Sequence, residues 1–154
     1  MNLSAMFQNY PLMAAVGAWL LAQIVKVPLN YFFTREVDWS LLLSAGGMPS
    51  SHSTLVTALG LTIGLEYGFD SPVFAVAFVT GAIVIYDATG VRRAAGEHAR
   101  VINRMIADLV EGHPLKEEEL KELLGHTPRQ VFVGVIFGFI VGWVLWWLLK
   151  AFTA

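Results

Sequence analysis

The sequence predicts an all-α integral membrane protein, a bundle of about four transmembrane helices with a cytoplasmic amphipathic helical insertion between the third and the fourth. Composition is the first reason. Of the 154 residues, 56% are hydrophobic and only 14% are charged, and the mean hydropathy is +0.61, whereas soluble domains carry about 25% charged residues. The second reason is that the apolar residues cluster into long runs. We expect residues 1–154 to form a single membrane domain.

The same composition excludes several classes of protein. A soluble enzyme or a disordered tail would need more charged residues, and a formal net charge of −2 excludes a nucleic-acid binder with a basic face. The chain has no cysteine, so disulfides, thiolate metal sites and cysteine nucleophiles are excluded. The first ten residues lack the Lys or Arg that begins a signal peptide. The first apolar run is therefore expected to stay as a transmembrane helix.

Four apolar segments are the candidate transmembrane helices. The first covers about residues 11–33 and is interrupted by Lys26. The second and third, about 53–69 and 72–88, are short, so we expect them to pack inside the bundle and not to face lipid all round. The fourth covers about 131–149. It carries three tryptophans near its end, where an interfacial aromatic belt would lie: Trp143, Trp146 and Trp147.

Glycines recur every fourth residue in two of these segments. Gly60 and Gly64 form one such pair, and Gly134, Gly138 and Gly142 continue the spacing in the last segment. Small residues at this spacing let helix backbones approach closely in a membrane. The pattern predicts tight helix contacts within the bundle, and the same faces are available to build a homodimer.

The one extended polar region lies between the third and fourth segments. Residues 91–129 hold seven of the ten Lys and Arg residues, and the insertion at about 95–124 has helical spacing of its apolar residues. The loop between the second and third segments has no Lys or Arg. The positive-inside rule therefore places the other two loops, and every polar cluster beside them, on the cytoplasmic side of a multi-pass membrane protein.

The first polar cluster is the stretch GGMPSSHS at residues 46–53, which opens the second segment. A helix N-terminus presents free N–H groups and partial positive charge, so it favours an anion such as phosphate. The hydroxyls of Ser50 and Ser51 would add hydrogen-bond donors, and His52 could give a proton to a leaving oxygen. The competing interpretation is a well-capped helix with an incidental histidine.

A second histidine precedes the fourth segment. His126 is followed by Thr127, a residue suited to a helix cap, by Pro128 at the first turn and by Gln130. A neutral imidazole is a nucleophile at neutral pH, and a helix N-terminus would stabilise the phosphate that it attacks. Gln130 could hold the other ring nitrogen. A simple helix cap is the alternative.

Cationic residues complete the polar clusters. Arg92 and Arg93 follow the third segment, and their guanidinium groups match phosphate oxygens in pairs; an interfacial anchor is the alternative. Asp87 lies near the end of that apolar helix and needs a cationic partner there. Lys26 and Arg35, nine residues apart, could project toward the same cytoplasmic pocket, although snorkelling would explain either one.

These stretches resemble the motifs of the type 2 phosphatidic acid phosphatase superfamily, which includes the vanadium haloperoxidases, and in particular its small divergent bacterial and plastid branch. GGMPSSHS resembles the motif Pro-Ser-Gly-His, with Ser51 in place of Gly. The run from His126 to Gly134 resembles the end of the third motif, whose Arg would be Arg92 or Arg93, split by an insertion. Lys26 and Arg35 loosely resemble the first motif.

The resemblance implies roles for these residues. His126 would be the nucleophile that forms a phosphohistidine, and His52 the general acid. Ser50 and Ser51 would add hydrogen bonds to a phosphate held by cations, and no metal or other cofactor would be needed. The cations that would form this phosphate clamp are Lys26, Arg35, Arg92 and Arg93.

The sequence also departs from the superfamily pattern. Gln130 stands where the superfamily has an Asp, so Asp87 or Glu97 would have to substitute, or the chemistry is slow or altered. A competing register pairs Arg92 with His98, at the six-residue separation of the motif. We favour His126, because it alone of the two precedes a membrane helix.

The function that follows is hydrolysis of a phosphate monoester, or a pyrophosphate, of a lipid at the cytoplasmic face. The partners are a phosphorylated lipid and the membrane. The main alternative is a non-catalytic membrane protein that binds phosphorylated lipids or transports a small anion. A structural dimerisation module that uses the glycine faces is a third interpretation.

Overall fold

The chain folds as a helical bundle in this computed structural model, which describes residues 3–44, 46–89, 98, 101–102, 104–106 and 127–153. No strand occurs within these ranges, so the all-α class is confirmed. Most of the predicted insertion at 95–124 lies outside them. In chain order the elements are the 3-10 helix η1 (Leu3–Gln8), α1 (Tyr10–Thr34), the 3-10 helix η2 (Trp39–Leu42), α2 (Ser51–Tyr67), α3 (Pro72–Thr89) and α5 (Pro128–Thr153).

Hydroxyl caps fix where three of the helices begin. Ser50 caps α2, and the hydroxyl of Ser71 accepts a hydrogen bond from the third following N–H, just ahead of Pro72 in α3. Thr127 caps α5 in the same way, ahead of Pro128. Helices α2 and α5 therefore begin two and three residues before the predicted starts, because the polar residues after each cap form the first turn.

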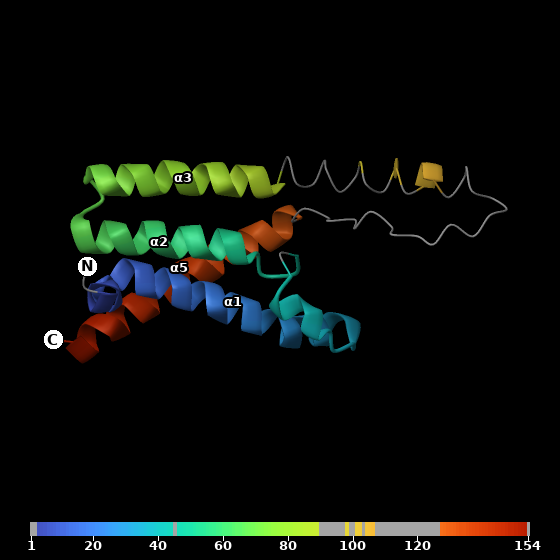
Figure 1. The fold of residues 1–154 in the computed structure, drawn as a ribbon, viewed down its shortest axis with the longest axis horizontal. Coiled ribbons are helices and arrows are strands. Elements are labelled where there is room, and N and C mark those ends of the chain that lie inside the picture. Colours follow the sequence, from blue (N-terminus) through green and yellow to red (C-terminus); the bar gives the residue numbers. More distant parts are fainter. Residues whose placement is uncertain are drawn as a thin grey trace.

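Helix α2 is the centre of the bundle (Figure 1). It packs against α1, α3 and α5, and α1 also packs against α5. Helices α2 and α5 run in one direction, and α1 and α3 run in the other. As a result the N-termini of α2 and α5 lie at the same end of the bundle as the C-termini of α1 and α3. The polar clusters at these helix ends therefore share one side of the bundle.

Small residues form the closest helix contact. A Cβ placed on Gly134 would lie 2.6 Å from the carbonyl oxygen of Ser50, and one on Gly138 would lie 2.5 Å from that of Thr54. Gly142 lies against Ala58 in the same way. The predicted glycine contact in the last segment is thus confirmed, and it joins α5 to α2.

The glycines of α2 do not make the predicted helix contact. A Cβ on Gly60 would meet nothing within 4 Å, and one on Gly64 would meet the ring of Phe69. Gly60 is buried but faces an open cavity between α2, α3 and α5. The spacing alone does not distinguish a glycine that packs against the backbone of another helix from a glycine that lines a cavity.

Among the described helices, three are long and apolar enough to cross a membrane: α1, α3 and α5. Helix α2 has 17 residues and carries buried Ser and Thr side chains, which its protein surroundings accommodate. The expectation that α3 would also pack inside the bundle is wrong. Only Gly81 and Ala88 of α3 are buried, because α3 contacts α2 with one face and leaves its other apolar side chains exposed or half-buried.

Candidate functional site

The N-termini of α2 and α5 are joined by a backbone hydrogen bond. The N–H of Ser50 donates to the carbonyl oxygen of Gln130 at 3.1 Å. Both helices run away from this point with their N-termini side by side (Figure 1). Two sets of first-turn N–H groups, each with the partial positive charge of a helix N-terminus, are therefore brought to one place.

Ser50 acts as the cap of α2. Its hydroxyl oxygen accepts from the N–H of Ser53 at 3.3 Å and lies 3.0 Å from the Ser53 hydroxyl. Both side chains are fully buried. The structure thus gives Ser50 a structural contact, and its contact with a substrate stays a prediction.

Thr54 connects α2 to α5 one turn further along α2. Its hydroxyl lies 2.9 Å from the carbonyl oxygen of Ser50 and 3.1 Å from that of Gly134 in α5. Such a bond across two helices is possible because Gly134 has no side chain to separate them. The relative position of the two N-termini is therefore fixed by backbone and buried hydroxyl groups.

Lys26 brings a positive charge to this junction from α1. Its side chain is 1% exposed, although it lies within a helix suited to cross a membrane. The Nζ atom donates to the carbonyl oxygen of Ser44 at 2.8 Å and lies 3.5 Å from the hydroxyl of Ser51. Within the described part of the chain no carboxylate lies within ion-pair distance of it. A buried cation held only by neutral groups favours an anionic ligand.

A small cavity of about 140 Å³ opens beside Lys26. Gly47 and Met48 line it from the loop before α2, and Gln130 lines it from α5. Gly47 has a φ of 86°, and a Cβ at this position would lie 3.4 Å from the Cδ atom of Lys26. The glycine is needed here both for the backbone conformation and for the close approach of the lysine stem.

Gln130 forms a reciprocal cap with Thr127 at the start of α5. Its side-chain oxygen accepts from the N–H of Thr127 at 3.0 Å, and its own N–H lies 3.4 Å from the Thr127 hydroxyl. This is the capping box of a helix N-terminus. The amide oxygen is therefore engaged with the backbone next to His126, and a contact with the His126 ring stays a prediction.

His52 lies in the first turn of α2, two residues after its cap. The side chain is half buried, and its Nδ1 atom is shielded from solvent. The sequence prediction that His52 follows directly on a capped helix N-terminus is confirmed. The first turn of α2, which contains His52, lies at the same end of the bundle as the start of α5 (Figure 1).

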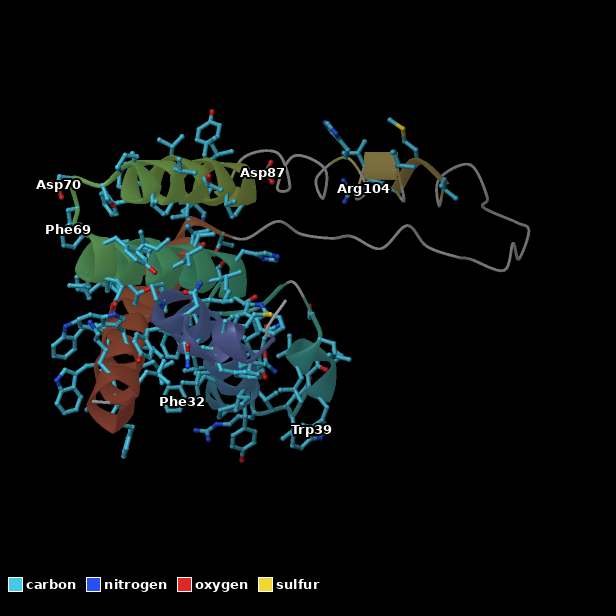
Figure 2. All side chains as sticks on the ribbon, turned by 60° about the vertical axis from the view of Figure 1, so that its left-hand side comes forward. Phe32, Trp39, Phe69, Asp70, Asp87 and Arg104 are labelled. Atoms are coloured by element: carbon cyan, nitrogen blue, oxygen red, sulfur yellow. The ribbon has the colours of Figure 1, made fainter. Side chains whose placement is uncertain are left out.

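Arg35 and Asp87 are not brought to the cavity. Arg35 ends α1 in a left-handed conformation with a φ of 63°, is exposed, and is absent from the cavity wall. Asp87 lies near the end of α3 (Figure 2) and is likewise absent from the cavity wall. The structure does not bring Arg35 to the cavity wall beside Lys26, and a role of Arg35 in binding phosphate stays a prediction.

The described residues leave out part of the predicted site. The nucleophile candidate His126, the arginines Arg92 and Arg93, and Glu97 lie outside them. His98, the competing nucleophile, is in a helical conformation and exposed. The roles of all five residues stay predictions.

Asn30 is a cavity residue that sequence reasoning missed. It lies one helical turn after Lys26 and lines the same cavity. Its amide group donates to the carbonyl oxygen of Glu36 at 3.1 Å and to the hydroxyl of Thr34 at 3.3 Å. The spacing of four residues from Lys26 was the available signal, because such residues share one helix face.

The chain is similar in sequence to known proteins. The sequence model of a family described as "Divergent PAP2 family" matches residues 7–141, a range that includes every candidate site residue. A protein of Bacillus subtilis (strain 168), described as the uncharacterized membrane protein YuiD, is 45% identical over 148 residues, which cover 89% of this chain and 94% of that protein. No solved structure matches the chain.

Proposed function

Because this chain belongs to the divergent PAP2 family, we propose that it is a membrane lipid phosphatase, which hydrolyses a phosphate monoester or a pyrophosphate of a lipid. The observation that carries the proposal is the burial of Lys26 at the junction of two helix N-termini, with no carboxylate beside it in the described residues. The adjoining cavity of about 140 Å³ has room for four to five groups the size of water, at about 30 Å³ each. A phosphate group is of that size.

The electrostatics support an anion in this cavity. The Lys26 ammonium would neutralise one negative charge, and the N-termini of α2 and α5 would stabilise further charge on the phosphate oxygens. Exclusion of water makes each of these interactions stronger than in solution. Arg92 and Arg93 are proposed to complete the phosphate clamp from the end of α3.

The reaction we propose has two steps. An imidazole nitrogen of His126 attacks phosphorus, and the bond from phosphorus to the lipid oxygen breaks while His52, protonated, gives that oxygen its proton. Water then attacks the phosphohistidine, His52 takes a proton from the water, and inorganic phosphate leaves. The products are the lipid alcohol, or the lipid monophosphate from a pyrophosphate, and phosphate. No metal ion takes part in this scheme.

The orientation in the membrane is part of the proposal. The chain is proposed to cross a bacterial plasma membrane several times, with the site at the cytoplasmic face, because the loops at the site end hold nearly all the Lys and Arg residues.

One observation favours a second function. The neutral side chain of Gln130 stands where the related superfamily has a carboxylate, and its oxygen is engaged in the capping box. A histidine without a carboxylate partner is a weaker base, so binding of a phosphorylated lipid without turnover is the second candidate.

Phosphate release from lipids separates the two functions. Purified protein is incubated in phosphatidylcholine vesicles with phosphatidate, phosphatidylglycerophosphate or a polyprenyl pyrophosphate. The phosphatase releases phosphate from at least one, and His126→Ala abolishes the release while the lipid still binds. Binding without release in both proteins would support the second function. No release and no binding by folded protein would contradict both.

A further inference from the structure

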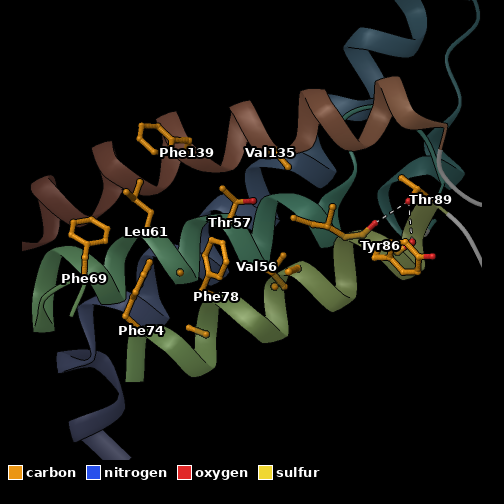
Figure 3. A pocket seen from close by; sticks show the side chains of 15 residues that line it. Val56, Thr57, Leu61, Phe69, Phe74, Phe78, Tyr86, Thr89, Val135 and Phe139 are labelled. Carbon is orange, nitrogen blue, oxygen red and sulfur yellow. Dashed lines mark hydrogen bonds between the residues drawn. The ribbon is translucent and has the colours of Figure 1, made fainter. Parts of the chain in front are cut away.

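A second and much larger cavity lies along the membrane-embedded part of the bundle. It has a volume of about 610 Å³ and is lined by α2, α3 and α5 (Figure 3). Its walls are almost wholly apolar and include the rings of Phe74, Phe78 and Phe139. We call this cavity the groove. Among the described residues, Lys26 and Arg35 are the cations of the predicted phosphate clamp, and neither lines the groove.

The few polar groups of the groove do not make it a polar site. The hydroxyl of Thr89 donates to the carbonyl oxygen of Tyr86 at 2.9 Å, so it is satisfied within α3. Among the described residues of the wall, only Thr57 and Tyr86 also carry a side-chain hydroxyl. A ligand of this groove must therefore be hydrocarbon over nearly all its length.

The dimensions favour a thin ligand. The groove extends along α3 from Phe74 to Thr89, a distance of about 22 Å at 1.5 Å per residue. A helix about 10 Å wide and of this length would occupy on the order of 1,700 Å³, nearly three times the cavity volume. An extended hydrocarbon chain fits where a helix of a second copy does not.

The groove opens toward lipid and toward the polar end of the bundle. Helix α3 packs against α2 and makes little contact with α5, so the side between α3 and α5 is open to the bilayer in the described structure. At the polar end the wall includes Tyr86 and Thr89 (Figure 3). His52 lies one helical turn before Val56, a residue of the wall, and hence on the same face of α2.

We propose that the groove binds one hydrocarbon chain of the phosphorylated lipid, with the chain entering sideways between α3 and α5 and the phosphate group at the His52 end. This inference rests on the proposed function for the identity of the head group. It explains why Gly60 is buried without any neighbour for a Cβ: a side chain there would fill the space of the ligand.

The test uses two variants that fill or narrow the groove and one that does not. Gly60→Leu adds a side chain into the groove, and Ala82→Leu narrows it from the exposed edge of α3. Val76→Leu is the matched control, because Val76 is 67% exposed on α3 and does not line the groove. The probe is phosphatidate with a photoreactive group in one acyl chain, in phosphatidylcholine vesicles, with the crosslinked peptides mapped by mass spectrometry.

We expect the probe to label groove residues of α2, α3 and α5, and Gly60→Leu or Ala82→Leu to reduce this labelling about tenfold or more, whereas Val76→Leu keeps it. If lipid is hydrolysed, the ratio of kcat/KM for long-chain over short-chain phosphatidate also falls in the first two variants. Labelling spread evenly over the exposed face of α3, unchanged in every variant, would overturn the proposal.

Crosslinking tests the groove, and phosphate release tests the proposed reaction, so the two proposals can fail independently. Labelling of the groove without phosphate release supports the groove and contradicts hydrolysis. Phosphate release with no labelling of the groove, and with the same chain-length ratio in Gly60→Leu, contradicts the groove and leaves the phosphatase in place. A melting temperature for each variant shows that the protein compared is folded.

Discussion

The N–H of Ser50 and the carbonyl oxygen of Gln130, 80 residues apart in the chain, form a hydrogen bond of 3.1 Å that joins the N-termini of α2 and α5. This bond places two polar clusters of the sequence, GGMPSSHS and the start of the last helix, at one end of the bundle. Lys26 of α1 reaches the same junction through its contacts with Ser44 and Ser51. The predictions below test this junction and the roles of its residues.

Gly134→Leu should separate α2 from α5. A Cβ here lies 2.6 Å from the carbonyl oxygen of Ser50, and backbone cannot move aside as a flexible side chain can. Overpacking of this kind costs about 1–3 kcal/mol, so the melting temperature in detergent should fall and phosphate release should be lost. Gly60→Ala is the matched control, because a Cβ there meets nothing within 4 Å. Equal melting temperatures for the two variants would contradict the close contact.

Lys26→Met should abolish the interaction with phosphate without unfolding the protein. Loss of a buried charge from an anion site costs about 2–5 kcal/mol of binding, so kcat/KM should fall about thirtyfold or more. Because an apolar side chain replaces an uncompensated buried cation, the melting temperature should hold or rise. Lys150→Met, which changes an exposed lysine near the other end of the bundle, should leave turnover unchanged. Unchanged turnover in Lys26→Met would contradict a role for Lys26 in binding phosphate.

Inorganic phosphate should stabilise the wild-type protein. A ligand that binds only the folded state raises stability by about 2.7 kcal/mol at a hundred times its Kd, so the melting temperature should rise with phosphate and not with chloride at equal ionic strength. The rise should be absent in Lys26→Met. An equal rise in both proteins would show a general salt effect and no site at Lys26.

Gln130→Glu tests the charge of the cavity wall. Glutamate keeps the acceptor of the capping box, so the melting temperature should not fall. Its negative charge would, however, oppose a phosphate beside Lys26, and we expect KM to rise about tenfold, a change of about 1.4 kcal/mol. Gln130→Leu instead removes the cap and should cost about 1 kcal/mol of stability. A KM unchanged by Gln130→Glu would place the phosphate elsewhere.

Glu66→Ala should weaken the opposite end of the bundle only. Glu66 accepts from the indole N–H of Trp146 at 2.8 Å and lies 3.1 Å from Lys150, so it joins the end of α2 to the last turns of α5. A hydrogen bond to a charged group contributes about 1.5–3 kcal/mol. We expect a lower melting temperature with unchanged kcat/KM. A loss of turnover in correctly folded Glu66→Ala would contradict a site confined to the other end.

Much of the fold follows from local sequence signals. Long apolar runs predict the helices, and the Ser and Thr residues ahead of α2 and α5 predict their caps, as Thr127 before Pro128 shows. Which helices pack against one another is harder to predict, because the packing depends on which face of each helix meets protein. Gly60 and Gly134 have the same spacing pattern, yet one faces a groove and the other a backbone.

The site was predictable where its residues follow helix starts and less so where they lie within helices. His52 and Gln130 stand at capped N-termini, so their sharing of one end follows from the alternating direction of the helices. Lys26 could be read as snorkelling, and only the structure shows it buried against Ser44 and Ser51. Asn30 is not predicted as a site residue, because its spacing of four residues from Lys26 is a weak signal for a polar residue near a helix end.

The most direct test of the proposed reaction is phosphate release from radiolabelled phosphatidate, phosphatidylglycerophosphate and polyprenyl pyrophosphate in vesicles, by wild-type protein and by His126→Ala, with acid-labile phosphoprotein measured in the same samples. We predict release from at least one lipid and a phosphohistidine at His126 in the wild type, with both absent in the variant. Release that continues undiminished in His126→Ala, or no release at all by folded wild-type protein, would contradict the proposal.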